Sequence, residues 1–185
     1  MTLTKTPVCD FKKQADFFKL KSINNNLLTL DEIKGENGTL VMFICNHCPY
    51  VKAVIKNIVD DCNFLISVGI NSVAINANDI KNYPEDSFEK MIQFSNNHNF
   101  NKLHYLLDEK QDVAKKYGAV CTPDFFGYNK DLKLQYRGRI RELIDLKPVD
   151  DSESDLRLAM KMISKTQKGP TKQIPSMGCN IKWIK

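Results

Sequence analysis

The chain has 185 residues, 42% of them hydrophobic, which is enough to bury one core and short enough that a single domain over residues 1–185 is expected. Its net charge of +5 comes from 27 Lys plus Arg and 22 Asp plus Glu, and the two signs are interspersed along the sequence. Interspersed charges predict a solvated surface and argue against a nucleic-acid-binding protein.

The N-terminal sequence carries no pattern of a secretory signal. It lacks the continuous apolar segment of such a signal, and no window approaches the roughly 18 apolar residues that span a membrane. We therefore expect a cytoplasmic protein without a membrane partner. In that reducing compartment the six cysteines should be thiols at rest, so any disulfide that they form should be transient and catalytic.

The first half of the sequence predicts a strand–helix–strand unit. Residues 18–23 predict an edge strand ahead of it. The apolar runs at 39–45 and 71–76 show no alternation, which is typical of parallel strands covered on both faces. Between them, residues 50–67 have apolar positions at helical spacing. The sequence thus predicts an α/β fold with a parallel pair at its centre.

The second half continues the same architecture up to a C-terminal tail. The predicted elements are a helix over 84–97, a strand over 104–107, a short helix over 111–117, a hairpin of strands 123–128 and 132–136, and an amphipathic helix over 155–163. The core should extend over about residues 18–165. The tail, residues 166–185, is punctuated by Pro and Gly and ends on apolar residues that include Ile181 and Trp183.

The stretch FICNHCPYV, residues 43–51, places a CxxC pair where the first central strand meets the helix. The first turn of a helix offers unpaired amides and the positive end of its dipole, and both stabilise a thiolate. This pattern predicts Cys45 as the nucleophile and Cys48 as the resolving thiol. His47 lies beside both sulfurs and should favour the thiolate further. Pro49 is tolerated because its missing amide hydrogen falls in the first helical turn.

Two other interpretations of the CxxC pair start from the same residues. Free cysteines are often buried and serve only in packing. A zinc site would need two further ligands, and the remaining cysteines provide no second CxxC: Cys9, Cys62, Cys121 and Cys179. The sequence therefore favours a redox dithiol that needs neither a metal nor a cofactor.

Several motifs together resemble a known family. The order of strand, CxxC and helix, with a later Thr-Pro that opens a strand, resembles the thioredoxin superfamily. More narrowly, the chain is similar from about residue 18 to 185 to the peroxiredoxin-like, or redoxin/AhpC-TSA-like, family. The motifs are CNHCPYVK, INANDIKNYPEDS, YLLDEKQDVAKKYGAVCTPDFFGYN, YRGRI and SMGCNIKW. This resemblance implies a thioredoxin-like fold, in which helices flank a central mixed β-sheet, with an N-terminal strand extension and a C-terminal tail.

The resemblance also implies the surroundings of the dithiol. It implies a cis peptide bond between Thr122 and Pro123 facing the CxxC, with the backbone of Thr122 pairing with a substrate chain as a short strand. Cys121 and Cys179 are candidate accessory thiols, although simple packing is the favoured interpretation of both. Ligands bind at the carboxyl edge of parallel strands, so the loop of residues 78–84 is expected to shape the substrate groove. The alternative is that its residues only stabilise the conformation of the loop.

The departures from the peroxiredoxin pattern argue against a peroxidase. In that family Pro-x-x-x-Thr/Ser-x-x precedes the peroxidatic cysteine, which corresponds to Cys48. Here Val41 stands at the Pro position and Cys45 at the Thr position. Arg137 and Arg139 are assigned to the end of a surface strand, so no cation is expected to stabilise a leaving oxygen.

The sequence therefore predicts a thiol-disulfide oxidoreductase that acts on protein or small-molecule disulfides and is recycled by a thioredoxin or glutathione system. His47 before the second cysteine predicts a dithiol more oxidising than that of thioredoxin. The alternatives are a peroxiredoxin-like thiol peroxidase with an antioxidant role, and a metal-handling binding module of thioredoxin fold.

Overall fold

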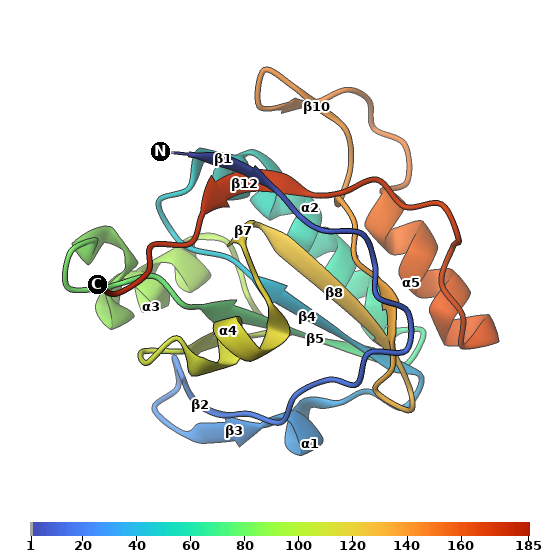
Figure 1. The fold of residues 1–185 in the computed structure, drawn as a ribbon, viewed down its shortest axis with the longest axis horizontal. Helices are drawn as coiled ribbons and strands as arrows, with labels where there is room; N and C mark the ends of the chain where they lie inside the picture. Colours follow the sequence, from blue (N-terminus) through green and yellow to red (C-terminus); the bar gives the residue numbers. More distant parts are fainter. Residues whose placement is uncertain (1) are drawn as a thin grey trace.

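A computed structural model describes residues 2–185, with a seven-stranded sheet at the centre of the molecule (Figure 1). The strands of this sheet are β2 (Lys19–Ser22), β3 (Leu27–Thr29), β4 (Gly38–Phe43), β5 (Ile70–Asn76), β6 (Leu103–Leu107), β8 (Asp124–Asn129) and β9 (Leu134–Tyr136). They lie in the order β3-β2-β6-β5-β4-β8-β9. The pairs β4–β5 and β5–β6 are parallel, and the other pairs are antiparallel. The predicted α/β fold with a mixed sheet is confirmed.

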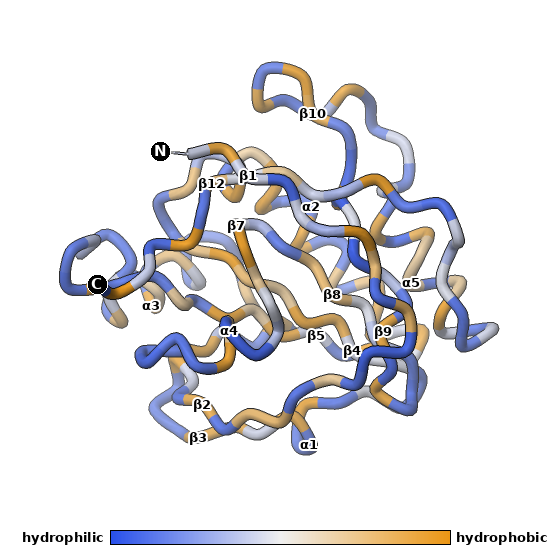
Figure 2. Tube along the Cα trace, in the orientation of Figure 1, coloured by the Kyte–Doolittle hydropathy of each residue, from blue (hydrophilic) through white to orange (hydrophobic). Residues whose placement is uncertain are grey.

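Helices cover both faces of this sheet. They are α1 (Leu30–Ile33), α2 (Pro49–Ile66), the 3-10 helix η1 (Pro84–Asp86), α3 (Phe88–Asn97), α4 (Asp112–Tyr117) and α5 (Asp155–Thr166). Along β4, Leu40 and Met42 pack with residues of α2, α3 and α5, whereas Val41 and Phe43 pack with residues of α1 and α4. Hydrophobic residues accordingly follow the central strands without alternation (Figure 2). The pattern predicted for strands covered on both faces is confirmed.

Two predicted elements differ from the structure. The segment predicted as an edge strand, β2, lies inside the sheet, because the chain reverses after it and β3 pairs along its outer side. The helix predicted over 84–97 is broken into η1 and α3. Ser87 separates them, and its side chain caps α3 by accepting a hydrogen bond from the amide of Lys90.

A second, three-stranded sheet brings the two ends of the chain together. It consists of β1 (Leu3–Lys5), β12 (Met177–Asn180) and β7 (Cys121–Thr122), with β12 in the middle and both pairings antiparallel (Figure 1). The tail is thus anchored by a strand. Ile181 is buried, and Trp183 is 38% exposed.

The strands β10 (Leu143–Ile144) and β11 (Lys147–Pro148) form a small separate hairpin. Among residues 2–185, no helix combines the length and the hydrophobicity that crossing a bilayer requires.

Candidate functional site

The CxxC loop connects the end of β4 to the start of α2. The helix begins at Pro49, which makes Cys48 its N-cap residue, and Cys45 lies one turn earlier in the loop. Both side chains are buried, with 1% of Cys45 and none of Cys48 exposed. The amides and the dipole at the start of α2 therefore act on Cys48 more directly than on Cys45.

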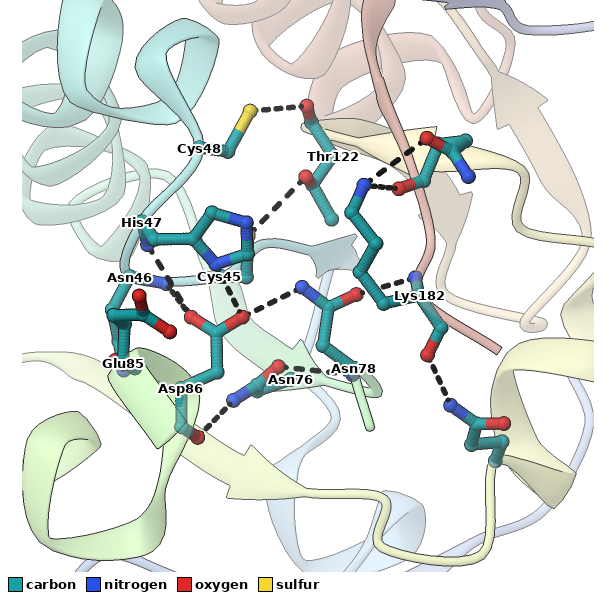
Figure 3. Close-up of polar contacts among 12 residues, drawn as sticks. Cys45, Asn46, His47, Cys48, Asn76, Asn78, Glu85, Asp86, Thr122 and Lys182 are labelled. Carbon is teal, nitrogen blue, oxygen red and sulfur yellow. Dashed lines mark hydrogen bonds and ion pairs between the residues drawn. The ribbon is translucent and has the colours of Figure 1, made fainter. Parts of the chain in front are cut away.

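Thr122 contacts both sulfurs from the opposite side (Figure 3). Its hydroxyl lies 3.4 Å from Cys45 Sγ, and its carbonyl oxygen accepts a hydrogen bond from the Cys48 thiol at 3.1 Å. The peptide bond between Thr122 and Pro123 is cis. The structure thus brings the four residues Cys45, Cys48, Thr122 and Pro123 to one place in the fold.

The contacts around the two thiols shift their pKa values in opposite directions. A hydrogen bond donated by Cys45 is the main cause that lowers the pKa of Cys48 to about 5, although burial opposes this. The Thr122 hydroxyl and the backbone amide of Val51 lower the pKa of Cys48 further. The pKa of Cys45 is raised well above its ordinary value by the same bond to Cys48, by burial and by the negative charge of Asp86. These pKa shifts favour the thiolate form at Cys48 over that at Cys45.

This order predicts a thiolate signal in the ultraviolet absorbance of the reduced protein. The signal should be present at about pH 7 and fall with a midpoint near pH 5, far below the ordinary cysteine pKa of about 8.5. It should vanish in Cys48→Ser and remain in Cys9→Ser, the matched control. A signal that persists in Cys48→Ser and disappears in Cys45→Ser would show that the order is reversed.

Asp86, a residue that the sequence interpretation did not select, holds the CxxC loop in place (Figure 3). Its side chain is fully buried. The carboxylate accepts hydrogen bonds from the backbone amides of Asn46, at 2.8 Å, and His47, at 3.3 Å. It also accepts one from the side-chain amide of Asn78, at 2.7 Å. The position of Asp86 in the sequence could have indicated this role. Asp86 follows β5, and the CxxC follows β4, so both lie at the carboxyl edge of the parallel strands.

His47 forms an ion pair with Asp86, Nδ1 to Oδ2, at 2.7 Å. This hydrogen bond is the main cause that raises the pKa of His47, against the effect of burial. Burial alone would raise the pKa of Asp86, but the bonds from His47 and Asn78 keep it below its ordinary value. The His47 ring also stacks on Tyr83, with 5.8 Å between the ring centroids. The loop of residues 78–84 therefore supports His47.

Three of these side chains could together hold a metal ion. Single ligand atoms of Cys45, His47 and Asp86 all lie within 4.8 Å of one another. Thiolate, imidazole and carboxylate are the ligand types that zinc accepts. Binding there would compete with the hydrogen bond between His47 and Asp86.

Both accessory thiols named from the sequence are buried near the dithiol. Cys121 precedes Thr122 in β7, and burial is the main cause of its raised pKa. Cys179 lies in β12 directly opposite Thr122, and burial and a hydrogen bond to Cys48 raise its pKa to about 12. In this structure the chain's own β12 is paired at Thr122, at the place where the resemblance implied a substrate strand.

Arg137 is not the surface residue that the sequence suggested. It is only 8% exposed, and its guanidinium forms an ion pair with the buried carboxylate of Asp124 at 2.9 Å. It also donates to the carbonyl oxygen of Gly118 at 2.7 Å and lies over the Phe126 ring. The carboxylate of Asp124 in turn accepts a hydrogen bond from the backbone amide of Val120. The pair thus braces the backbone on both sides of Thr122 and Pro123.

Two hollows flank β12 on the surface. One, of about 480 Å³, is lined by Thr2, His47, Tyr83, Glu85, Asn180 and Lys182. The other, of about 710 Å³, has Tyr50, Pro123 and Met177 in its wall. Met177 and Asn180 of β12 lie in the walls of the two hollows, whereas Cys45 and Cys48 line neither of them and are buried.

Comparisons with known proteins show the family and the fold of the chain. Residues 11–142 match the AhpC/TSA family. The chain is 38% identical to an uncharacterized conserved protein from Geobacillus kaustophilus, with 100% of this chain and 97% of that one covered and a TM-score of 0.90. It is 35% identical to a hypothetical protein from Sinorhizobium meliloti 1021, with 98% of each chain covered and a TM-score of 0.89.

A more distant structure shares only the fold. It is a secreted disulfide oxidoreductase from Mycobacterium tuberculosis, with 15% identity, a TM-score of 0.54, and 64% of this chain and 80% of that one covered. The search of the curated proteins found no match. With a family match over residues 11–142 and a thioredoxin-like fold, the chain belongs to the AhpC/TSA family of redoxins.

Proposed function

We propose that the protein is a thiol-disulfide oxidoreductase whose attacking group is the Cys48 thiolate and whose resolving thiol is Cys45. The observation that carries this proposal is the place of Cys48, which occupies the N-cap position of α2 and accepts a hydrogen bond from the Cys45 thiol. A thiolate is the nucleophile of disulfide exchange, so a lowered pKa at Cys48 assigns it the first step. The roles are exchanged relative to the sequence prediction because the helix starts after the second cysteine rather than at the first.

The reaction proceeds in two exchanges. Cys48 attacks one sulfur of a substrate disulfide, the other sulfur leaves as a thiolate, and a mixed disulfide forms at Cys48. Cys45 then loses its proton and attacks Cys48 Sγ, which releases the second substrate thiolate and forms the Cys45–Cys48 disulfide. A thiol reductant of the thioredoxin or glutathione type restores the dithiol. The lowered pKa of Cys48 stabilises the reduced form and so supports the prediction of an oxidising dithiol.

His47 and Asp86 position the reacting loop. The carboxylate of Asp86 fixes the backbone on which the dithiol sits, and its hydrogen bond to Nδ1 raises the pKa of His47, which favours the positively charged form of the ring beside Cys48. That charge favours the thiolate form of Cys48.

The proposal is tested by the reduction of a small aromatic disulfide, with dithiothreitol as the recycling reductant. We expect multiple turnovers by the wild type and none above background by Cys45→Ser/Cys48→Ser. The same assay with hydrogen peroxide in place of the disulfide should give slower turnover than the disulfide does. Faster turnover of peroxide than of the disulfide would favour the thiol peroxidase instead.

A metal-binding role is a second candidate, favoured by the closeness of Cys45, His47 and Asp86. Its test is the metal content of protein purified without a chelator. About one zinc per chain in the wild type, lost in Asp86→Asn, would favour this role over redox catalysis.

A further inference from the structure

The C-terminal strand β12 occupies the place at Thr122 where a substrate chain was expected to pair. It runs antiparallel to β7, with Cys179 opposite Thr122 and Asn180 opposite Cys121. On its other side it pairs with β1 (Figure 1). The dithiol therefore faces a strand of its own chain.

This strand is closely fitted to Thr122 and Pro123. A Cβ atom added to Gly178 would lie 2.0 Å from the carbonyl oxygen of Thr122, so glycine is needed at this approach. Just before β12, the hydroxyl of Ser176 donates to the carbonyl oxygen of Pro123 at 2.8 Å. Just after it, the backbone amide of Ile181 donates a hydrogen bond to the carbonyl oxygen of Val120 at 3.3 Å. β12 is thus held in register along the segment that contains the cis peptide bond.

The register places Cys179 opposite Thr122, whose carbonyl oxygen also contacts the Cys48 sulfur. The side chains of Cys179 and Cys48 are hydrogen-bonded, and Cys179 is only 4% exposed. Cys48 also accepts a hydrogen bond from Cys45. The proposed attacking sulfur therefore lies between two protonated thiols, one from the CxxC loop and one from β12.

We propose that Cys179 is a second resolving thiol, which displaces a substrate or Cys45 from Cys48 and forms a Cys48–Cys179 disulfide. This rests on the proposed function, since it needs a mixed or internal disulfide at Cys48. In the exchange, Cys179 gives up its proton, its sulfur bonds to Cys48 Sγ, and the group previously bonded to Cys48 leaves as a thiolate. The number of disulfides is unchanged, so a disulfide substrate is the only oxidant required.

The Cys48–Cys179 disulfide would fix β12 across Thr122. A polypeptide substrate cannot then pair with Thr122, because the backbone groups of Thr122 stay occupied by β12. Cys45 would at the same time be released as a thiol. The oxidised protein would thus exist in two forms, one with the Cys45–Cys48 disulfide and one in which β12 is covalently joined to Cys48.

The experiment uses the full chain with Cys9→Ser as background, since Cys9 is partly exposed and would add its own reaction. Cys45→Ser in this background is mixed with one equivalent of 5,5′-dithiobis(2-nitrobenzoic acid). If Cys179 resolves the mixed disulfide, two nitrothiobenzoate ions are released per chain. The protein then carries no adduct mass, and peptide mapping finds Cys48 joined to Cys179.

Two further variants provide the comparison. Cys45→Ser/Cys179→Ser should release one ion and keep the adduct on Cys48. Cys45→Ser/Cys121→Ser, the matched control, should still release two. One ion and a lasting adduct in Cys45→Ser would overturn the role of Cys179 and leave the attack by Cys48 intact. No release from any variant would overturn the attack by Cys48, and the role of Cys179 with it.

Discussion

Replacing Cys48 with serine should lower the rate of disulfide reduction by at least about 10³-fold, as expected when a nucleophile is removed. A serine hydroxyl is not ionised near neutral pH, so the N-terminus of α2 and the hydrogen bond from Cys45 have no thiolate to stabilise. The measurement is the initial rate of reduction of an aromatic disulfide, with Cys9→Ser as the control at the wild-type rate.

Cys45→Ser should behave differently from Cys48→Ser. The first exchange remains available to it, so stoichiometric release of one substrate thiol should continue while multiple turnover slows. Mass spectrometry should then find the substrate attached to Cys48 or, if Cys179 resolves it, the Cys48–Cys179 disulfide. If Cys45→Ser failed to react at all while Cys48→Ser accumulated an adduct on Cys45, the assignment of the attacking thiol would be reversed.

Replacing Arg137 with methionine should reduce the free energy of unfolding by about 3–5 kcal/mol, because it leaves a buried carboxylate without its cation. Asp124 is fully buried and is paired with Arg137 at 2.9 Å. The matched control is Arg139→Met. Arg139 pairs with Asp155 at 2.6 Å near the surface, so its loss should cost no more than about 1 kcal/mol. Urea unfolding measures both changes.

The reduction in the free energy of unfolding caused by Arg137→Met should depend on pH. Burial raises the pKa of Asp124 from 3.8 to about 6 even with Arg137 opposing it. A carboxyl group with a raised folded pKa contributes its stability below pH 3.8, and this stability is lost as the pH rises through about 6. Removing the cation raises this pKa further, so the variant should be more destabilised at about pH 8 than at about pH 5.

A double variant separates charge from packing in this prediction. Asp124→Asn/Arg137→Met removes the unpaired charge and should recover much of the lost stability and its pH dependence. An equal loss at both pH values, without recovery in the double variant, would mean that the methionine disturbs packing instead.

The central part of the fold could be predicted because its signals are local. The apolar runs of β4 and β5 and the helical spacing of α2 are each contained in one segment, and a strand–helix–strand unit follows from them. Even the cap of α2 had a signal, since Pro49 at the first helical position makes Cys48 the N-cap residue. The exchange of roles that we propose for the two cysteines could thus have been considered from the proline alone.

The rest of the site depends on contacts between distant segments. The pairing of Cys179 with Thr122 and the ion pair between Arg137 and Asp124 are set by strand register, which no single stretch of sequence specifies. Asp86 had a positional signal, but several polar residues share its loop, and only packing determines which one turns toward the CxxC.

The three-stranded sheet ties the surroundings of the dithiol to segments that are far apart in the sequence. Its members are β1, β12 and β7, and β12 pairs with both of the others. Residues 3–5 and residues 177–180 therefore belong to the same structural unit as Thr122. A substitution in β1 that disturbs its pairing with β12 can thus reach the backbone beside the dithiol without touching either cysteine.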